Sequence, residues 1–339
     1  MIITSAFQHV SWISTFRSTA KAAGISLRVF AACTNPALSP ACLMADAAVA
    51  LPPVSHPQYI EKLLKSCLQL EVGLLVPGSP RELLKLACAK PLFESNGTKV
   101  AVPGQSFVSV SRDPVALDRI AVSAGTTPRG LAELSDVVRQ PGNYSWPMDV
   151  LPRKWLNEDL DTLYLRNPGD LRRVPESAPV LITSRRSGRR MTVLTYFDDQ
   201  GRLEWRGAVR SGILKGGGIK FAETIDDNEA TLIVERMASQ FHQVTGPVAF
   251  MLLKDSSGGL YLENMVPVLP KELSLFARAG SPIAGRLLLL GTGGSPEPNN
   301  AQWDPGLRLL FYDAPMILLR PEAAGQKHNG ANQASFALQ

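Results

Sequence analysis

The chain has 339 residues, which is enough for one large domain or for two smaller ones. Hydrophobic residues make up 45% and charged residues 19%, and this excludes a wholly disordered chain because disordered chains are poor in apolar residues. The formal net charge of +5 is too small on its own to indicate a protein that binds nucleic acid.

Neither the N-terminus nor any apolar run indicates export or membrane insertion. The segment Met1–Ala6 lacks the charged start and long apolar stretch of a signal peptide, and no apolar run reaches the roughly 18 residues of a membrane span. The four cysteines match no Cys-x-x-Cys metal pattern and are too sparse for a disulfide scaffold. We therefore expect a cytoplasmic protein with reduced thiols and no membrane partner. The cysteines are Cys33, Cys42, Cys67 and Cys88.

Strands and helices are predicted to alternate through the first hundred residues. Apolar runs predict strands, and apolar residues at helical spacing, with glycine or proline at the boundaries, predict helices. Strands separated by helices of this length are typical of a parallel sheet with helices on its faces. Strands are expected at 2–5, 26–32, 72–76 and 99–102, and helices at 10–23, 57–68 and 80–89.

The remainder of the chain predicts a different architecture. One helix is expected near its start, and the many prolines between 126 and 179 predict little regular structure there. Paired strands and one long helix follow, with turns at 198–201 and 255–258. Helices are expected at 113–125, 227–244 and 273–279, and strands at 180–184, 191–197, 202–209, 248–254 and 259–263.

Two stretches resemble the ATP-grasp superfamily. Ser39-Pro40, Ala45-Asp46 and Tyr59-Ile60 stand in the order found in the pre-ATP-grasp domain of its carbamoyl-phosphate-synthetase-like branch. Near the other end, Gly246-Pro247 and Glu263-Asn264 are similar to the strand pair that closes the active site of that superfamily. The order and spacing of these motifs extend over most of the chain.

The resemblance implies a fold and a division into domains. The fold class is α/β, with α+β character in the C-terminal part: a pre-ATP-grasp parallel-sheet domain is followed by a two-lobed ATP-grasp-like body. We expect the first domain at 1–111 and the body at 112–320. A reduced lid lobe is expected at about 126–190, and residues 321–339 are expected to form a flexible tail.

The resemblance also implies a chemistry. Ligases of this superfamily use ATP and Mg²⁺ to convert a carboxylate to an acyl-phosphate, which an amine then attacks. Such a reaction needs cations beside the phosphates and oxygen ligands for the metal. Glu263 matches a metal-binding position. Asn264 follows it, but neighbouring residues on a strand normally face opposite sides. The cations expected to face phosphates are Arg153, Lys154, Lys215 and Lys220.

Several positions depart from the superfamily pattern. Leu151 stands where the lysine before the lid is usual, and Pro114 stands beside Asp113 where an earlier lysine is usual. Met265 replaces the second metal-site residue, and the first metal ligand falls at Ala249 or Met251. Thioether sulfur is a poor ligand for a hard cation. Residues 154–159 stand where the glycine-rich lid loop is usual and contain no glycine. We therefore expect weak or absent binding of ATP with Mg²⁺, and a reduced or irregular lobe at 140–179 without the usual sheet.

Two basic segments allow more than one interpretation. Gly216–Gly218, between Lys215 and Lys220, is either a phosphate-binding loop or a mobile loop. The run from Arg185 to Arg190 contains four arginines around a Ser-Gly turn. It could meet an acidic partner or phosphates, or it could be the solvated tip of a hairpin.

Two functions are compatible with these features. The first is a non-catalytic or weakly active ATP-grasp relative that acts as a binding or regulatory partner, for example of an active ATP-grasp ligase. The second is an active ATP- and Mg-dependent ligase that joins a small carboxylate to an amine. A nucleic-acid binder would rest only on the basic charge, and the arginine run lacks the interleaved aromatic residues of a single-strand-binding surface.

Overall fold

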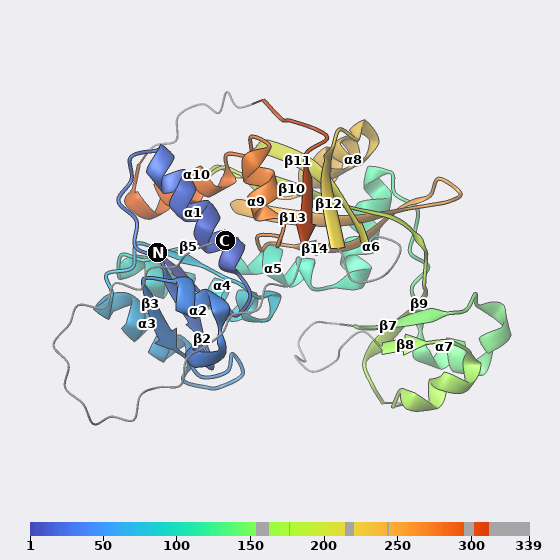
Figure 1. Cartoon of the computed structure of the whole chain (residues 1–339). Helices are drawn as coiled ribbons and strands as arrows, with labels where there is room; N and C mark the ends of the chain where they lie inside the picture. Colours follow the sequence, from blue (N-terminus) through green and yellow to red (C-terminus); the bar gives the residue numbers. More distant parts are fainter. Residues whose placement is uncertain (154–162, 176, 214–219, 243, 295–301, 312–339) are drawn as a thin grey trace.

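The computed structural model describes residues 1–153, 163–175, 177–213, 220–242, 244–294 and 302–311. Within these residues the strands form a five-stranded, a six-stranded and a four-stranded sheet. Figure 1 shows the four-stranded sheet set apart from the other two. No helix in these ranges is both long and apolar enough to cross a membrane. The domain boundaries given above remain predictions, and residues 321–339 lie outside the described residues.

The predicted parallel sheet is confirmed, with strand order β3-β2-β1-β4-β5. The segment expected at 26–32 becomes a strand only from Phe30, and β3 was not predicted. Helix α1 contacts α2, and α3 contacts α4. The strands are β1 (Ile2–Ile3), β2 (Phe30–Cys33), β3 (Ala47–Ala50), β4 (Leu74–Val76) and β5 (Lys99–Val100); the helices are α1 (Val10–Ala22), α2 (Pro40–Met44), α3 (Tyr59–Gln69) and α4 (Leu83–Ser95).

The six-stranded sheet has the order β14-β13-β10-β11-β12-β15, and all its pairs are antiparallel. The predicted pairing of 248–254 with 259–263 is confirmed, because Lys254 lies opposite Leu260. The strands are β10 (Gly188–Phe197), β11 (Leu203–Ile213), β12 (Lys220–Ile225), β13 (Gly246–Asp255), β14 (Leu260–Val266) and β15 (Arg308–Phe311).

Helices cover this sheet on two faces. One face packs its buried residues against α6 and α8, and the other against α9 and the parallel-sheet domain. Asp113 caps α6 by accepting hydrogen bonds from Val115 and Ala116, so its predicted start is confirmed. The helix expected at 227–244 ends earlier, at Ala238. The helices are α5 (Gln105–Ser111), α6 (Pro114–Ala124), α8 (Asn228–Ala238), α9 (Leu273–Arg278) and α10 (Ile283–Thr292).

The expectation of an irregular segment at 140–179 is wrong. This region contributes strands to a regular sheet of order β6-β9-β7-β8, which packs on α7. Pro141 and Pro168 begin short 3₁₀ turns between the strands, and Pro152 lies at the end of β7, so none of these three prolines interrupts the interior of a strand. The elements are β6 (Ala132–Glu133), α7 (Leu134–Arg139), β7 (Met148–Pro152), β8 (Leu163–Leu165) and β9 (Val180–Ser184). The expected site of the lid loop, 154–159, lies outside the described residues.

One hydrophobic core joins the parallel-sheet domain to the six-stranded sheet. Helix α10 packs on α1 and on β4, although more than 200 residues separate it from either element. The approach is close because two glycines meet there: a Cβ on Gly73 would lie 2.5 Å from the Gly291 carbonyl oxygen. The buried Trp12 on α1 also donates a hydrogen bond to the Pro270 carbonyl at 3.1 Å.

Replacing Trp12 should measure how strongly this junction stabilises the fold. We expect Trp12→Phe to lower the free energy of unfolding by about 1–3 kcal/mol, because the Pro270 carbonyl loses its buried donor. Trp12→Ala should cost about 3–5 kcal/mol, since a cavity is added. Urea unfolding followed by circular dichroism gives both values. Equal losses for the two variants would contradict a separate contribution of the hydrogen bond.

Candidate ligand-binding site

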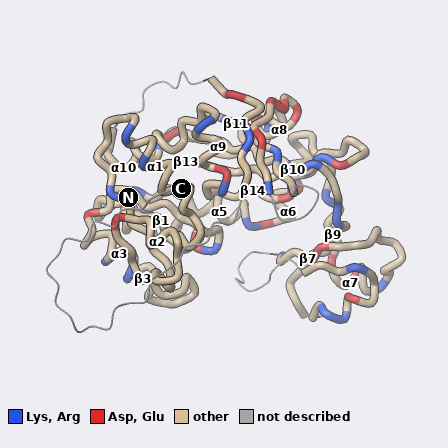
Figure 2. The backbone as a smooth tube through the Cα atoms, viewed as in Figure 1, with Lys and Arg blue, Asp and Glu red and all other residues tan. Residues whose placement is uncertain are grey.

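The connection between β9 and β10 links the four-stranded sheet to the six-stranded sheet. This connection is rich in lysine and arginine residues, which are blue in Figure 2. It cannot be a hairpin tip, because the two strands belong to different sheets, so that alternative for the arginine run is wrong. On the side of the small sheet, Arg185 pairs with Asp149 of β7 at 3.3 Å and lies over the ring of Tyr164.

The other three arginines of the run contact groups of the larger body. Arg186 lies 4.2 Å from the centre of the Tyr261 ring, and Arg189 pairs with Asp227 at 2.9 Å. Arg190 binds Glu263 through two nitrogens, with Nε 3.0 Å from Oε2 and Nη2 3.2 Å from Oε1. The run therefore engages groups of its own chain on both sides of the connection.

A β-bulge places Glu263 beside Arg190. Met251 of β13 lies opposite Asn264 and Leu252 opposite Leu262, so one residue of β14 is left without a partner. Leu262 and Met265 both enter the core beneath α6 and α8. Glu263 and Asn264, which lie between them, therefore both belong to the opposite face of the sheet. The expectation that Asn264 faces away from Glu263 is wrong.

These residues do not make a fitting Mg²⁺ site. The Glu263 carboxylate is engaged by an arginine, and the residue across from Asn264 is Met251, whose sulfur suits a hard cation poorly. Among the described residues, no group of three or more His, Cys, Asp or Glu side chains is placed to hold a metal ion.

Two further charged groups lie near this pair. Arg129 donates from Nη1 to the carbonyl of Glu263 at 2.9 Å, and burial lowers the pKa of its guanidinium. Burial also raises the pKa of the Asp149 carboxyl, against the opposing effects of Arg185 and Arg129. The region between the sheets is thus a network of mixed charge in which each arginine already has an acceptor or an aromatic contact.

Of the cations that were expected to face phosphates, the structure describes Arg153, next to β7 of the four-stranded sheet, and Lys220, on β12 of the six-stranded sheet. Arg153 pairs with Glu133 of β6, with an Nη2 to Oε1 distance of 2.7 Å. Lys220 lies exposed at the start of β12. Leu151, at the position of the usual lysine, is buried in β7. Lys154, Lys215 and Gly216–Gly218 lie outside the described residues.

A cavity of about 390 Å³ opens on the six-stranded sheet beside Arg190. Its other charged groups are Lys220, Lys271 and Glu272. Burial raises the pKa of the Glu272 carboxyl, and the adjacent Lys271 acts in the opposite direction. The Lys271 amine also lies 5.5 Å from the centre of the Phe311 ring, within reach of a cation–π contact. Apolar and neutral residues complete the wall: Gly188, Ser211, Gly212, Phe221 and Phe311.

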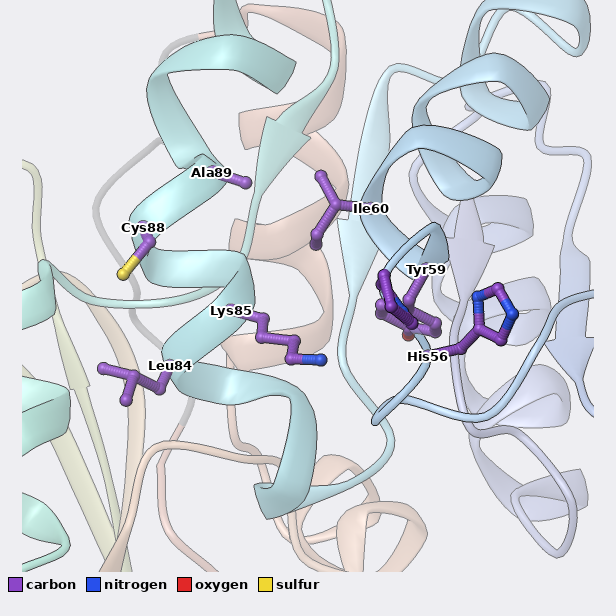
Figure 3. A pocket seen from close by; sticks show the side chains of 8 residues that line it. His56, Tyr59, Ile60, Leu84, Lys85, Cys88 and Ala89 are labelled. Atoms are coloured by element: carbon purple, nitrogen blue, oxygen red, sulfur yellow. The ribbon is translucent and has the colours of Figure 1, made fainter. Parts of the chain in front are cut away.

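A second cavity, of about 500 Å³, lies in the parallel-sheet domain between α3 and α4 (Figure 3). Ile60 of α3 and Ala89 of α4 point toward each other across it, and its lining is mostly apolar. Lys85, which also lines it, donates to the Val54 carbonyl at 2.5 Å. This cavity is the poorer candidate for a charged ligand.

The cavity at the six-stranded sheet was not predicted from the sequence. Lys220 and Arg190 were predicted to be functional candidates, whereas Lys271 and Glu272 were not. Their signal was present in the sequence, since a Lys-Glu pair begins eight residues after Glu263, beyond a short segment that contains two prolines. Arg129 carried no such signal, because only tertiary structure brings it to the Glu263 carbonyl.

Comparison with known proteins identifies the class of this architecture. The biotin carboxylase domain of 2-oxoglutarate carboxylase from Hydrogenobacter thermophilus matches with a TM-score of 0.63 and 14% identity, over 89% of this chain and 72% of that one. Biotin carboxylase from Campylobacter jejuni matches with a TM-score of 0.64 and 14% identity, over 89% of this chain and 73% of that one. N5-carboxyaminoimidazole synthetase from Staphylococcus aureus matches with a TM-score of 0.61 and 14% identity, over 88% of this chain and 78% of that one.

The chain therefore has the fold of the ATP-grasp superfamily, as the sequence motifs implied. More particularly, residues 1–101 match the family described as the PylC-like N-terminal domain. No curated protein sequence matches the chain. The structure from Hydrogenobacter thermophilus holds ADP, magnesium and bicarbonate.

Proposed function

We propose that this chain is a non-catalytic relative of the ATP-grasp ligases that binds a small carboxylate. The ligand would occupy the cavity lined by Arg190, Lys220 and Lys271. In this proposal the chain does not hydrolyse ATP, and the cavity on the six-stranded sheet serves only to bind the ligand. The cavity volume of about 390 Å³ is within the range typical of small-molecule sites.

The contact between Arg190 and Glu263 is the observation that carries the proposal. A metal ion at Glu263 would have to displace a guanidinium held through two nitrogens. Without that carboxylate, the triphosphate would keep its negative charge in a site that has also lost a lysine at Leu151. The non-catalytic function thus follows from an arginine that replaces the metal as the partner of Glu263.

The charges in the cavity support a carboxylate as ligand. Three basic side chains and one carboxyl group line it, and the raised pKa of Glu272 favours the neutral form of that group. A neutral carboxyl can donate a hydrogen bond to a ligand oxygen. Phe221 and Phe311 would contact an apolar part of the ligand.

Removing one lysine should weaken binding. We expect Lys271→Ala or Lys220→Ala to raise the dissociation constant for a small carboxylate about tenfold or more, since a hydrogen bond to a charged group contributes about 1.5–3 kcal/mol. Thermal-shift screening of acetate, succinate, citrate and the standard amino acids selects the probe, and isothermal titration then gives the constants. Lys62→Ala, on an exposed part of α3, is the matched control. Failure of the whole panel to bind, or an equal loss in the control, would contradict the proposal.

The alternative, an active ligase that joins a carboxylate to an amine through an acyl-phosphate, draws support from the retained Glu263 and from the same cavity. It requires Arg190 to release Glu263 when nucleotide and metal arrive. Steady formation of ADP from MgATP in the presence of a carboxylate and an amine would favour it over the non-catalytic function.

A further inference from the structure

Two buried thiols touch in the parallel-sheet domain. The sulfur atoms of Cys33 and Cys42 lie 3.5 Å apart. Cys33 is the last residue of β2, and Cys42 lies in the short helix α2 that packs beside that strand. Cys67 and Cys88 lie on α3 and α4, and all four cysteines are free thiols. Cys33 and Cys42 are called the thiol pair below.

Backbone contacts hold the thiol pair in place. The Cys42 N–H donates to the Ser39 hydroxyl at 3.2 Å, and the Cys42 thiol donates to the Ala31 carbonyl at 3.4 Å. Cys33 pairs with Ala50 within the sheet. A disulfide has an S–S bond of about 2.05 Å, so the two sulfurs need to approach by only about 1.5 Å.

The two thiols differ in access. Cys33 lines a cavity of about 250 Å³ at the carboxyl end of the parallel sheet, together with Ser5, Thr34 and Leu51. Cys42 does not line this cavity and is 4% exposed. Burial raises the pKa of the Cys42 thiol to about 11, so it is a poor first nucleophile. A small oxidant that enters the cavity therefore meets Cys33 first.

We propose that the thiol pair is an oxidation site at which a hydroperoxide converts Cys33 and Cys42 to a disulfide. The Cys33 sulfur attacks the terminal peroxide oxygen; the O–O bond breaks, the thiol proton leaves with the departing alcohol or water, and Cys33 becomes a sulfenic acid. The Cys42 sulfur then attacks the Cys33 sulfur and the S–O bond breaks. Loss of water, which includes the Cys42 proton, leaves the disulfide.

The disulfide would join β2 to α2 across a loop of the chain that contains Ser39. Ser39 caps α2 and donates from its hydroxyl to the Phe7 carbonyl, which follows β1. Both Cys33 and Phe7 line the 250 Å³ cavity. Oxidation would therefore stiffen one wall of this cavity, and reduction would release it.

Mass spectrometry of the full-length protein tests the proposal. The reduced protein is freed of reductant, treated with hydrogen peroxide, unfolded in an alkylating reagent and digested with trypsin. Trypsin leaves both thiols in one peptide, 29–62. We expect this peptide to lose two hydrogen atoms and to take up no reagent, while a phosphine reductant restores two alkylated cysteines. Full alkylation of the peptide at a peroxide dose that oxidises the exposed Cys88 would overturn the proposal.

Single variants test the order of the steps. In Cys42→Ser the sulfenic acid has no partner, so dimedone should label Cys33 after peroxide treatment. Cys33→Ser should leave Cys42 open to alkylation, and Cys88→Ser, the matched control, should form the disulfide as the wild type does. A disulfide that forms in Cys33→Ser, or one in the wild type that links Cys88 to either member of the pair, would contradict the assignment.

Discussion

Titration of the full-length protein with MgATP is expected to show no binding in the micromolar range and no release of ADP. By the resemblance to the superfamily, Leu151 stands at a usual lysine position and Ala249 or Met251 at a usual metal-ligand position, and Glu263 is bound to Arg190. One charge pair at about 4 Å contributes up to about 4 kcal/mol at an effective dielectric constant near 20. Each loss of about 1.4 kcal/mol weakens binding tenfold, so two lost contacts remove several orders of magnitude.

Isothermal titration and an ADP-release assay with mixed carboxylates and amines measure this result. Micromolar binding that Glu263→Ala abolishes would overturn the non-catalytic function, and so would steady ADP formation. If binding occurs through substitute cations, Arg153→Ala or Lys220→Ala should reduce it. Alanine variants of Lys154 and Lys215 complete that set.

A loss of stability as large as that of Trp12→Ala is expected for Glu82→Ala. The Glu82 side chain is fully buried, and its Oε1 accepts hydrogen bonds from the N–H groups of Gly78 and Ser79 at 2.9 and 3.0 Å. Its Oε2 accepts from the Tyr59 hydroxyl at 2.5 Å. Alanine leaves these three donors, among them the buried Tyr59 hydroxyl, without their partner, and we expect a loss of about 3–5 kcal/mol in urea unfolding.

Glu82→Gln is the matched control, because an amide can still accept from both N–H groups. A loss as large as that of Glu82→Ala would contradict the importance of those bonds. The comparison also has a defined pH dependence. Burial raises the pKa of Glu82 above its ordinary 4.5, so the folded state retains the proton longer than the unfolded state. The stability of the wild type relative to Glu82→Gln should therefore fall as pH rises above about 4.5, and stay constant below it.

Local sequence signals predicted the parallel sheet and the hairpin of the large sheet because both rest on short-range patterns. Apolar strands alternate with helices in the first hundred residues, and a turn at 255–258 separates two apolar runs. The four-stranded sheet was missed because β6 and β8 contribute only two and three residues. Strands this short have no readable alternation, and prolines in their connections looked like interruptions of the whole region.

The site was harder to predict because it depends on contacts distant in sequence. Glu263 was identified from its motif, but the guanidinium that binds it belongs to Arg190, 73 residues earlier. The bulge beside Met251 also places Asn264 on the same face of the sheet as Glu263. Neither Met251 nor Asn264 predicts a bulge from the sequence alone. Single charged residues could therefore be identified from the sequence, but the residues that they contact could be identified only from the folded structure.

The meeting of Gly73 and Gly291 has a consequence for synthesis of the chain on the ribosome. Strand β4 is made early, but the helix that covers it ends at Thr292. Until that helix emerges, the nascent parallel sheet exposes the apolar surface on which α10 will pack. At roughly 5–20 residues per second, the more than 200 intervening residues leave this surface bare for about 10 seconds or longer. The nascent N-terminal domain is therefore expected to be a substrate for chaperones that bind apolar segments during translation.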